Sequence, residues 1–249
     1  MTGKLYGIGV GPGDPELMTV KAIKTIRECH VLAIPISDKN FKEVRYEAQG
    51  EECQNSELLK SCVAYGIVYP MAPEIEKMAK LYIPMPMIKD KEILKAIHDE
   101  GASEVAKLLS EGKNIAFITL GDPTVYSTCL YIQKRIKKMG FDTALIPGVS
   151  SFCAAAARMD MGLVENKEQL HVIPGSYDIE DSLELPGTKV LMKAGRKMAD
   201  VKKSMARSGG HIEMVENCGM ENEKIYRSVD EIPDDAGYYS LIMIKEERK

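Results

Sequence analysis

Hydrophobic and polar residues along the first part of the chain alternate in blocks that predict strands and helices in turn. The apolar run 4–10 predicts a buried strand that ends in glycines. Val20, Ile23 and Ile26 fall at helical spacing, and 30–35 has the pattern of a second short strand. Because a strand, a helix and a strand in this order normally form a crossover between parallel strands, the chain is expected to begin with a parallel sheet.

The same pattern continues to about residue 158. A helical stripe begins after Asp90 and is interrupted by Gly101, and the apolar run 114–120 predicts a central strand covered on both faces. A helix is expected from about Thr124, with Met139 among its inward-facing residues. The other elements expected here are a strand over part of 81–87, a strand at 141–146 and a helix at 150–158.

The second half of the chain is richer in strand patterns. The fold class expected is therefore α/β with two domains: 1–146 with a mainly parallel sheet, and 147–249 with a mixed sheet. The charged segment 37–55 has no clear periodicity and is interpreted as a surface excursion. Expected elements of the second half are strands at 170–173, 188–192, 212–215, 224–226 and 238–245, and a helix at 198–207.

Composition narrows the class of protein. The chain has 249 residues, 45% of them hydrophobic, which is enough for a substantial core. A net charge of −4 gives no general attraction to nucleic acid. No apolar run reaches the roughly 20 residues of a membrane span, so a cytoplasmic protein without a membrane partner is expected. The six cysteines and four histidines show no ligand spacing, so no metal site is expected.

The first candidate for chemistry is the glycine-rich loop 7–15, with the sequence GIGVGPGDP. Alternating glycines let a ligand approach the backbone closely. A dinucleotide fingerprint fails, because GxGxxG meets Pro12 or Asp14 at its last position, and no Gly-Lys-Ser/Thr follows. Asp14 would repel a phosphate, whereas it suits a cationic ligand. The alternative is a structural turn in which Asp14 caps a helix.

A second loop at 120–128, LGDPTVYST, repeats the arrangement of an apolar strand, a glycine, an aspartate and a proline. In parallel sheets, ligands bind at the carboxyl ends of strands, where both loops would meet. S-adenosylmethionine fits such a site, because it carries a sulfonium cation and no phosphate. The loop 147–151 offers amides and hydroxyls at a helix N-terminus, and 192–197 carries three cations that suit a polyanionic substrate or simply a solvated face.

These motifs resemble those of the tetrapyrrole methylases, also called class III methyltransferases. The resemblance rests on 6–17 (YGIGVGPGDPEL), on 117–128 (FITLGDPTVYST), which is similar to the version in C20-methyltransferases of precorrin-2 or cobalt-factor II, and on 147–158. It extends over nearly the whole chain, although 39–55 is longer and more charged than the family pattern. It implies two α/β domains, S-adenosylmethionine in the cleft between them, a tetrapyrrole substrate and a homodimer.

The resemblance also implies a role for individual residues. Asp14 and Tyr126 would border the substrate and are the candidates for a catalytic base, while Lys193 and Arg196 would meet its carboxylates. The residues implied to bind the cofactor are Pro12, Leu120, Gly121, Asp122, Val125, Ser150, Ser151, Met192, Lys193, Gly219 and Met220.

Other functions remain open at this point. A methylase of the same fold could act on another tetrapyrrole carbon, an RNA ribose or a modified histidine. A nicotinamide-dependent oxidoreductase would use Asp38, past the second strand, to bind a ribose, but the broken fingerprint and Asp14 argue against it. A non-catalytic sensor would bind S-adenosylmethionine without turnover.

Overall fold

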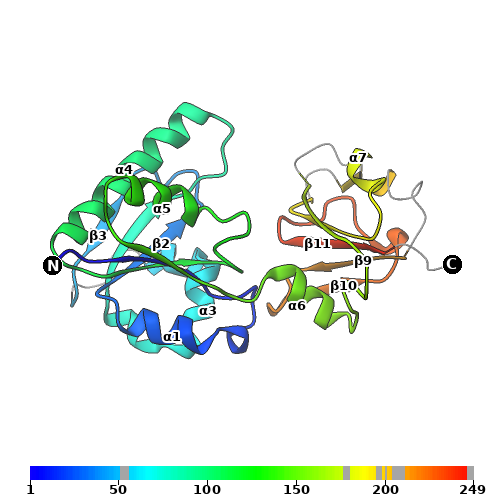
Figure 1. Cartoon of the computed structure of the whole chain (residues 1–249), viewed down its shortest axis with the longest axis horizontal. Coiled ribbons are helices and arrows are strands. Elements are labelled where there is room, and N and C mark those ends of the chain that lie inside the picture. Colours follow the sequence, from blue (N-terminus) through cyan, green and yellow to red (C-terminus); the bar gives the residue numbers. More distant parts are fainter. Residues whose placement is uncertain (51–55, 176–179, 195–197, 200, 204–210, 246–249) are drawn as a thin grey trace. The chain divides into compact units, whose positions relative to one another are not determined.

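The computed structural model describes residues 1–50, 56–175, 180–194, 198–199, 201–203 and 211–245. The chain divides into two compact units, Met1–Ser150 and Ser151–Lys249. A six-stranded sheet lies in the first unit and a five-stranded sheet in the second (Figure 1). The expected α/β fold is confirmed, and in this structure the first sheet is mainly parallel and the second is mixed.

The first unit alternates strands with helices for most of its length. Its strands are β1 (Leu5–Gly9), β2 (Val31–Ile36), β3 (Arg45–Glu47), β4 (Ala79–Pro84), β5 (Ile115–Thr119) and β6 (Thr143–Ile146). Its helices are α1 (Val20–Arg27), α2 (Ser56–Ser61), α3 (Val63–Met71), α4 (Lys91–Ser110) and α5 (Cys129–Lys138), with 3-10 turns η1 (Pro15–Leu17) and η2 (Pro73–Lys77).

The first sheet has the strand order β3-β4-β2-β5-β1-β6, and every pair except β3 with β4 is parallel. Helices α1 and α3 cover one face and α4 and α5 the other (Figure 1). All five residues of β5 are buried, as a strand covered on both faces requires. The neighbours β1 and β5 lead to helices on opposite faces, which is the topology at which such sheets bind ligands.

Some expectations for the first unit were wrong in detail. The helix after β5 begins at Cys129, not at Thr124, and Met139 is half exposed at its C-cap. Helix α4 continues through Gly101 without interruption. A Cβ at this position would lie 2.9 Å from the Ile83 side chain, so the glycine lets the helix approach β4 closely. The charged excursion contains β3, whose Glu47 accepts a 2.7 Å hydrogen bond from the buried Tyr82 hydroxyl.

The second sheet has the order β10-β9-β11-β8-β7, in which β7 and β8 are parallel and the other neighbours antiparallel. The expected strands are present, and the expected helix at 198–207 lies only partly within the described residues. The elements are α6 (Ser151–Arg158), β7 (Leu170–Pro174), α7 (Glu180–Leu183), β8 (Thr188–Met192), β9 (His211–Glu216), β10 (Lys224–Tyr226), η4 (Val229–Glu231) and β11 (Ser240–Lys245).

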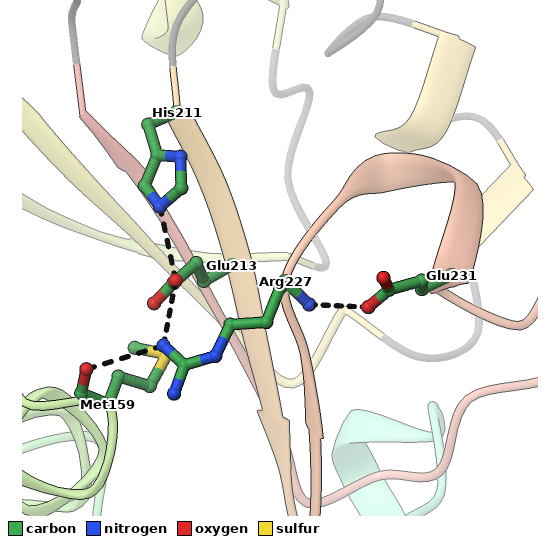
Figure 2. A network of polar contacts seen from close by, with 5 residues as sticks. All are labelled: Met159, His211, Glu213, Arg227 and Glu231. Carbon is green, nitrogen blue, oxygen red and sulfur yellow. Dashed lines mark hydrogen bonds and ion pairs between the residues drawn. The ribbon is translucent and has the colours of Figure 1, made fainter.

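A buried carboxylate and the arginine that it binds connect β9, the end of α6 and η4 in the second unit (Figure 2). Glu213 of β9 is buried, and its Oε1 lies 2.8 Å from Nη1 of Arg227 and 3.1 Å from Nε2 of His211. The same Nη1 of Arg227 donates to the carbonyl of Met159, just past α6, at 3.3 Å. The backbone amide of Arg227 donates to Glu231 in η4. Because a buried charge is costly without partners, this network fixes the end of α6 to the sheet.

Candidate active site

Two of the predicted loops pair with each other at the carboxyl edge of the first sheet. The amide of Gly121 donates to the carbonyl of Gly11 at 2.7 Å, and the amide of Gly11 donates back to Gly121 at 3.3 Å. One residue earlier, the amide of Val10 donates to Thr119 at 3.0 Å. The loops after β1 and β5 are therefore extended side by side beyond the sheet, as the sequence predicts.

A third loop, which follows β6, packs against these two through glycines. A Cβ added to Gly9 would lie 2.5 Å from the carbonyl oxygen of Gly121 and 2.7 Å from the amide nitrogen of Gly148. A Cβ on Gly148 would lie 2.3 Å from the same Gly121 oxygen. No side chain fits at such distances, so glycine is required for this close approach of three backbone segments.

Asp122 connects the second and third loops through its side chain. The carboxylate is buried; Oδ2 accepts the Gly148 amide at 3.0 Å, and Oδ1 accepts the Thr124 amide at 2.8 Å. The Thr124 hydroxyl also donates to Oδ1. Three protein donors thus bind this carboxylate, so its role in this structure is to connect the two loops.

Asp14 caps a short helical turn, which is the structural alternative considered from the sequence. Its Oδ1 accepts the Glu16 amide at 2.9 Å and caps the short turn η1, and the side chain is half-buried. Pro12 is buried in the same loop. The cap fixes the carboxylate of Asp14 at the edge of the sheet, beside the paired loops.

Tyr126 stands out by its backbone. Its φ is 47°, in the left-handed region that a bulky side chain rarely adopts, and the residue is 47% exposed. Ser127 beside it lies 2.9 Å from the Thr119 hydroxyl and accepts the Cys129 amide at 3.2 Å. These bonds shape 121–128 as a loop and explain why α5 begins late. Leu120, just before this loop, and Val125, within it, are half-buried.

The predicted residues of the second unit follow β8 and β9. Both strands pair antiparallel with β11, so their carboxyl ends lie at the same edge of the sheet. There the amide of Lys193 donates to Ser240 at 3.3 Å, and the amide of Asn217 donates to Tyr239 at 3.0 Å. The sheet therefore brings Met192 and Lys193 to the same edge as the turn with Gly219 and Met220.

Lys193 also has a left-handed backbone, with φ 61°, and its Nζ lies 5.5 Å from the centre of the Tyr238 ring. Asn217 has φ 53°. With Tyr126, three predicted loops at strand ends thus contain a non-glycine residue in this conformation, which is enriched at functional sites. Arg196 lies outside the described residues. Ser150 ends the first unit, and Ser151 begins α6 in the second.

The charges of the three loops in the first unit have one sign. Residues 9–19, 119–128 and 147–150 contain Asp14, Glu16 and Asp122 but no Lys, Arg or His. Carboxylates without a neighbouring cation repel a phosphate, so this composition favours a ligand that is cationic or donates hydrogen bonds. Within the described residues no group of three His, Cys, Asp or Glu side chains could hold a metal ion, and no helix has the length and apolar character needed to cross a membrane.

The contacts of Glu223 and Arg158 were not predicted from the sequence. Glu223 accepts the Gly219 amide at 2.7 Å and a forked pair of bonds from Arg158. Arg158 was part of the alanine-rich motif but was given no role. A glutamate in a polar turn has no local signature, so only the folded turn reveals its partners.

Known proteins resemble this chain over nearly its full length. The model of the tetrapyrrole (corrin/porphyrin) methylases matches residues 4–232. A probable cobalt-precorrin-2 C(20)-methyltransferase of Methanocaldococcus jannaschii is 34% identical over 97% of this chain and 96% of its own length. A precorrin-2 C(20)-methyltransferase of a Sinorhizobium species is 29% identical over 97% and 95%.

Among solved structures, the uroporphyrin-III C-methyltransferase of Thermus thermophilus in complex with S-adenosyl homocysteine has the same fold. The TM-score is 0.65 at 18% sequence identity, and the match covers 98% of this chain and 92% of that one.

Proposed function

Since the chain belongs to the tetrapyrrole methylase family, we propose that it transfers a methyl group from S-adenosylmethionine to C20 of precorrin-2 or cobalt-factor II in cobalamin biosynthesis. The support for C20 is that the two relatives described above, similar over nearly their full length, both carry that activity in their names. The more similar of the two is named for the cobalt-containing substrate, and we propose that form here.

The observation that carries the proposal is the character of the three loops in the first unit. Their backbones are held together by the Gly11–Gly121 bridge and the Asp122–Gly148 bond, and they carry carboxylates without a cation. This set of groups fits S-adenosylmethionine, which has a sulfonium and an ammonium and lacks phosphate. The Thermus thermophilus methyltransferase, with its bound S-adenosyl homocysteine, supports the same cofactor.

Most of the proposed contacts are made by backbone and small side chains. When bound, S-adenosylmethionine supplies a methyl group made electrophilic by the positive sulfur. Asp122 contributes by holding the loop after β5 against the loop after β6, since its oxygens already accept protein donors. The residues proposed to hold the cofactor are Pro12, Leu120, Gly121, Val125, Ser150, Ser151, Met192, Lys193, Gly219 and Met220.

The protein's main contribution is placement. Fixing two reactants in attack geometry can correspond to effective molarities of about 10⁵ to 10⁸ M. Asp14, oriented by its bond from the Glu16 amide, is proposed to accept the proton that leaves C20, with Tyr126 as the second candidate. Lys193 and Arg196 are proposed to pair with carboxylates of the tetrapyrrole.

Incubation with isotope-labelled S-adenosylmethionine and either precorrin-2 or cobalt-factor II tests the proposal. Mass spectrometry should show one added methyl group, and NMR of the product should place it on C20. Methylation at another carbon would contradict the position, and the relative rates with the two substrates decide the cobalt question. Retained NADH fluorescence would instead support the oxidoreductase.

We also propose that the enzyme works as a homodimer in the cytoplasm, as the family resemblance implies. Size-exclusion chromatography with light scattering measures the assembly directly. A mass of one chain at micromolar concentration would contradict the dimer.

A further inference from the structure

The turn between β9 and β10 is a compact, internally bonded segment. The amide of Met220 donates to the carbonyl of Asn217 at 2.9 Å, and the amide of Glu223 donates to Met220 at 3.0 Å. Asn217 and Gly219 have φ values of 53° and 77°. Two left-handed residues within three positions fold the chain back sharply, and such a turn needs support from outside.

Glu223 supplies that support from the end of the turn. Its Oε2 accepts the Gly219 amide at 2.7 Å, and its side chain is only 11% exposed. Burial alone would raise the pKa of this carboxyl, but hydrogen bonds from Arg158 and the Gly219 amide outweigh burial and hold it below the usual value. The carboxylate therefore stays ionised at neutral pH and remains bonded to the turn.

Arg158 holds Glu223 in place from helix α6. Its Nε lies 2.9 and 3.1 Å from the two carboxylate oxygens, and its Nη2 lies 2.6 Å from Oε1. This forked arrangement fixes the orientation of the carboxylate as well as its position. The backbone just after Arg158 is itself held, because Arg227 donates to the Met159 carbonyl (Figure 2).

We infer that Glu223 and Arg158 are positioning residues for the cofactor: they set the conformation of the Gly219–Met220 peptide on which its binding depends. The inference rests on the proposed function, which assigns Gly219 and Met220 to S-adenosylmethionine. The Gly219 and Met220 amides are both donated within the turn, and the Met220 carbonyl already accepts the Glu223 amide, so the polar backbone group that this peptide offers to the ligand is the Gly219 carbonyl, an acceptor. The part of the cofactor bound here is thus a hydrogen-bond donor.

Isothermal titration with S-adenosylmethionine tests this without relying on turnover. Glu223→Ala should weaken binding about tenfold and Arg158→Met about threefold, as expected for losing hydrogen bonds to a charged group. Arg158→Lys should restore part of the loss. Since Arg158 acts through Glu223, the double variant should bind no more weakly than Glu223→Ala alone.

The matched control is Glu221→Gln, which removes one charge from an exposed position in the same turn and should leave affinity unchanged. In steady-state assays Glu223→Ala should raise KM for S-adenosylmethionine while kcat stays within about twofold. Circular dichroism melts show which variants fold; if Glu223→Ala does not, Glu223→Gln and Arg158→Met carry the test.

The outcomes separate the two hypotheses. Folded variants that bind S-adenosylmethionine like the wild type would overturn the inference and leave the proposed function standing. A wild-type protein that does not bind S-adenosylmethionine would overturn the proposed function, and the inference with it.

Discussion

The carboxylate of Asp122 accepts a hydrogen bond from the amide of Gly148 at 3.0 Å, across 26 residues of sequence. This single contact joins the loop after β5 to the loop after β6. The family resemblance implies that Asp122 lies at the cofactor, and the structure shows that its carboxylate holds these two loops together.

Substitution of Asp122 should separate these loops. Asp122→Ala removes acceptors for two partly buried amides and the Thr124 hydroxyl, so the free energy of unfolding should fall by about 1–3 kcal/mol and S-adenosylmethionine affinity at least tenfold. Asp122→Asn should also bind poorly, because both oxygens are used and an amide NH₂ would face a donor. Urea denaturation and calorimetry measure the two effects.

The control for Asp122 is Asp142→Asn, an exposed aspartate of the same unit. This substitution should change neither the free energy of unfolding nor the affinity for S-adenosylmethionine. Unaltered cofactor affinity in a folded Asp122→Ala variant would show that the loops stay together without this carboxylate.

Asp14→Asn should separate capping from catalysis. Asparagine keeps the Oδ1 that accepts the Glu16 amide, so stability and cofactor affinity should remain close to wild type. Because the amide cannot accept a proton from C20, kcat should fall about 100-fold. Single-turnover kinetics measures this step.

Asp38→Asn is the matched control for Asp14. Asp38 accepts the Asn40 amide at 2.8 Å in the same kind of turn, and it is the residue that a nicotinamide-dependent enzyme would use. Full methyl transfer by Asp14→Asn would exclude Asp14 as the base and leave Tyr126, for which Tyr126→Phe is the test.

Tyr126→Gly should uncouple stability from activity. Relief of the left-handed backbone is worth about 1 kcal/mol and offsets the contacts of a half-exposed side chain, so the free energy of unfolding should not fall by more than about 0.5 kcal/mol. Methyl transfer should drop at least tenfold if the ring borders the substrate. Tyr239→Gly, whose backbone is not left-handed, should instead lose about 1 kcal/mol. Equal losses in both variants would contradict the prediction.

His98 predicts a pH dependence of the first unit. Burial lowers the pKa of its ring below 6.5, the nearby charge of Arg135 adds to this, and Asp99 opposes it. The unfolded chain therefore binds the proton more readily, so stability should be complete above about pH 6.5 and fall as the pH drops towards the folded value. His98→Phe keeps the stacking on Tyr131 and should remove this slope in urea titrations at pH 7.5 and 5.5. An identical slope in both proteins would assign it to other groups.

Local patterns in the sequence predicted the elements of this fold that depend on neighbours in the chain. The apolar run at β5 and the glycines after β1 are such signals, because burial on both faces and close backbone approach restrict residue type directly. The start of α5 was missed because hydroxyls and Asp122 bond the preceding loop into turns, and tertiary contacts outweigh helix propensity there. The short β3 has no apolar alternation to reveal it.

Contacts between distant positions account for the rest of the site. The Asp122–Gly148 bond spans 26 residues and the Arg158–Glu223 pair spans 65. Neither contact changes the local composition, so the connecting role of Asp122 could not be predicted from the sequence. Motif resemblance selected positions at the strand ends, while the bonds that give those positions their shape appear only in the folded chain.

The close contact among Gly9, Gly121 and Gly148 affects how much conformational entropy the loops lose when a ligand binds. Backbones packed this closely leave little room for local opening, so the amide protons of Gly121 and Gly148 should exchange with deuterium as slowly as those of β5, in the absence of any ligand. Loops that are already ordered lose little conformational entropy when a small molecule arrives. Fast exchange at these two amides would instead mean that the ligand must order the loops itself.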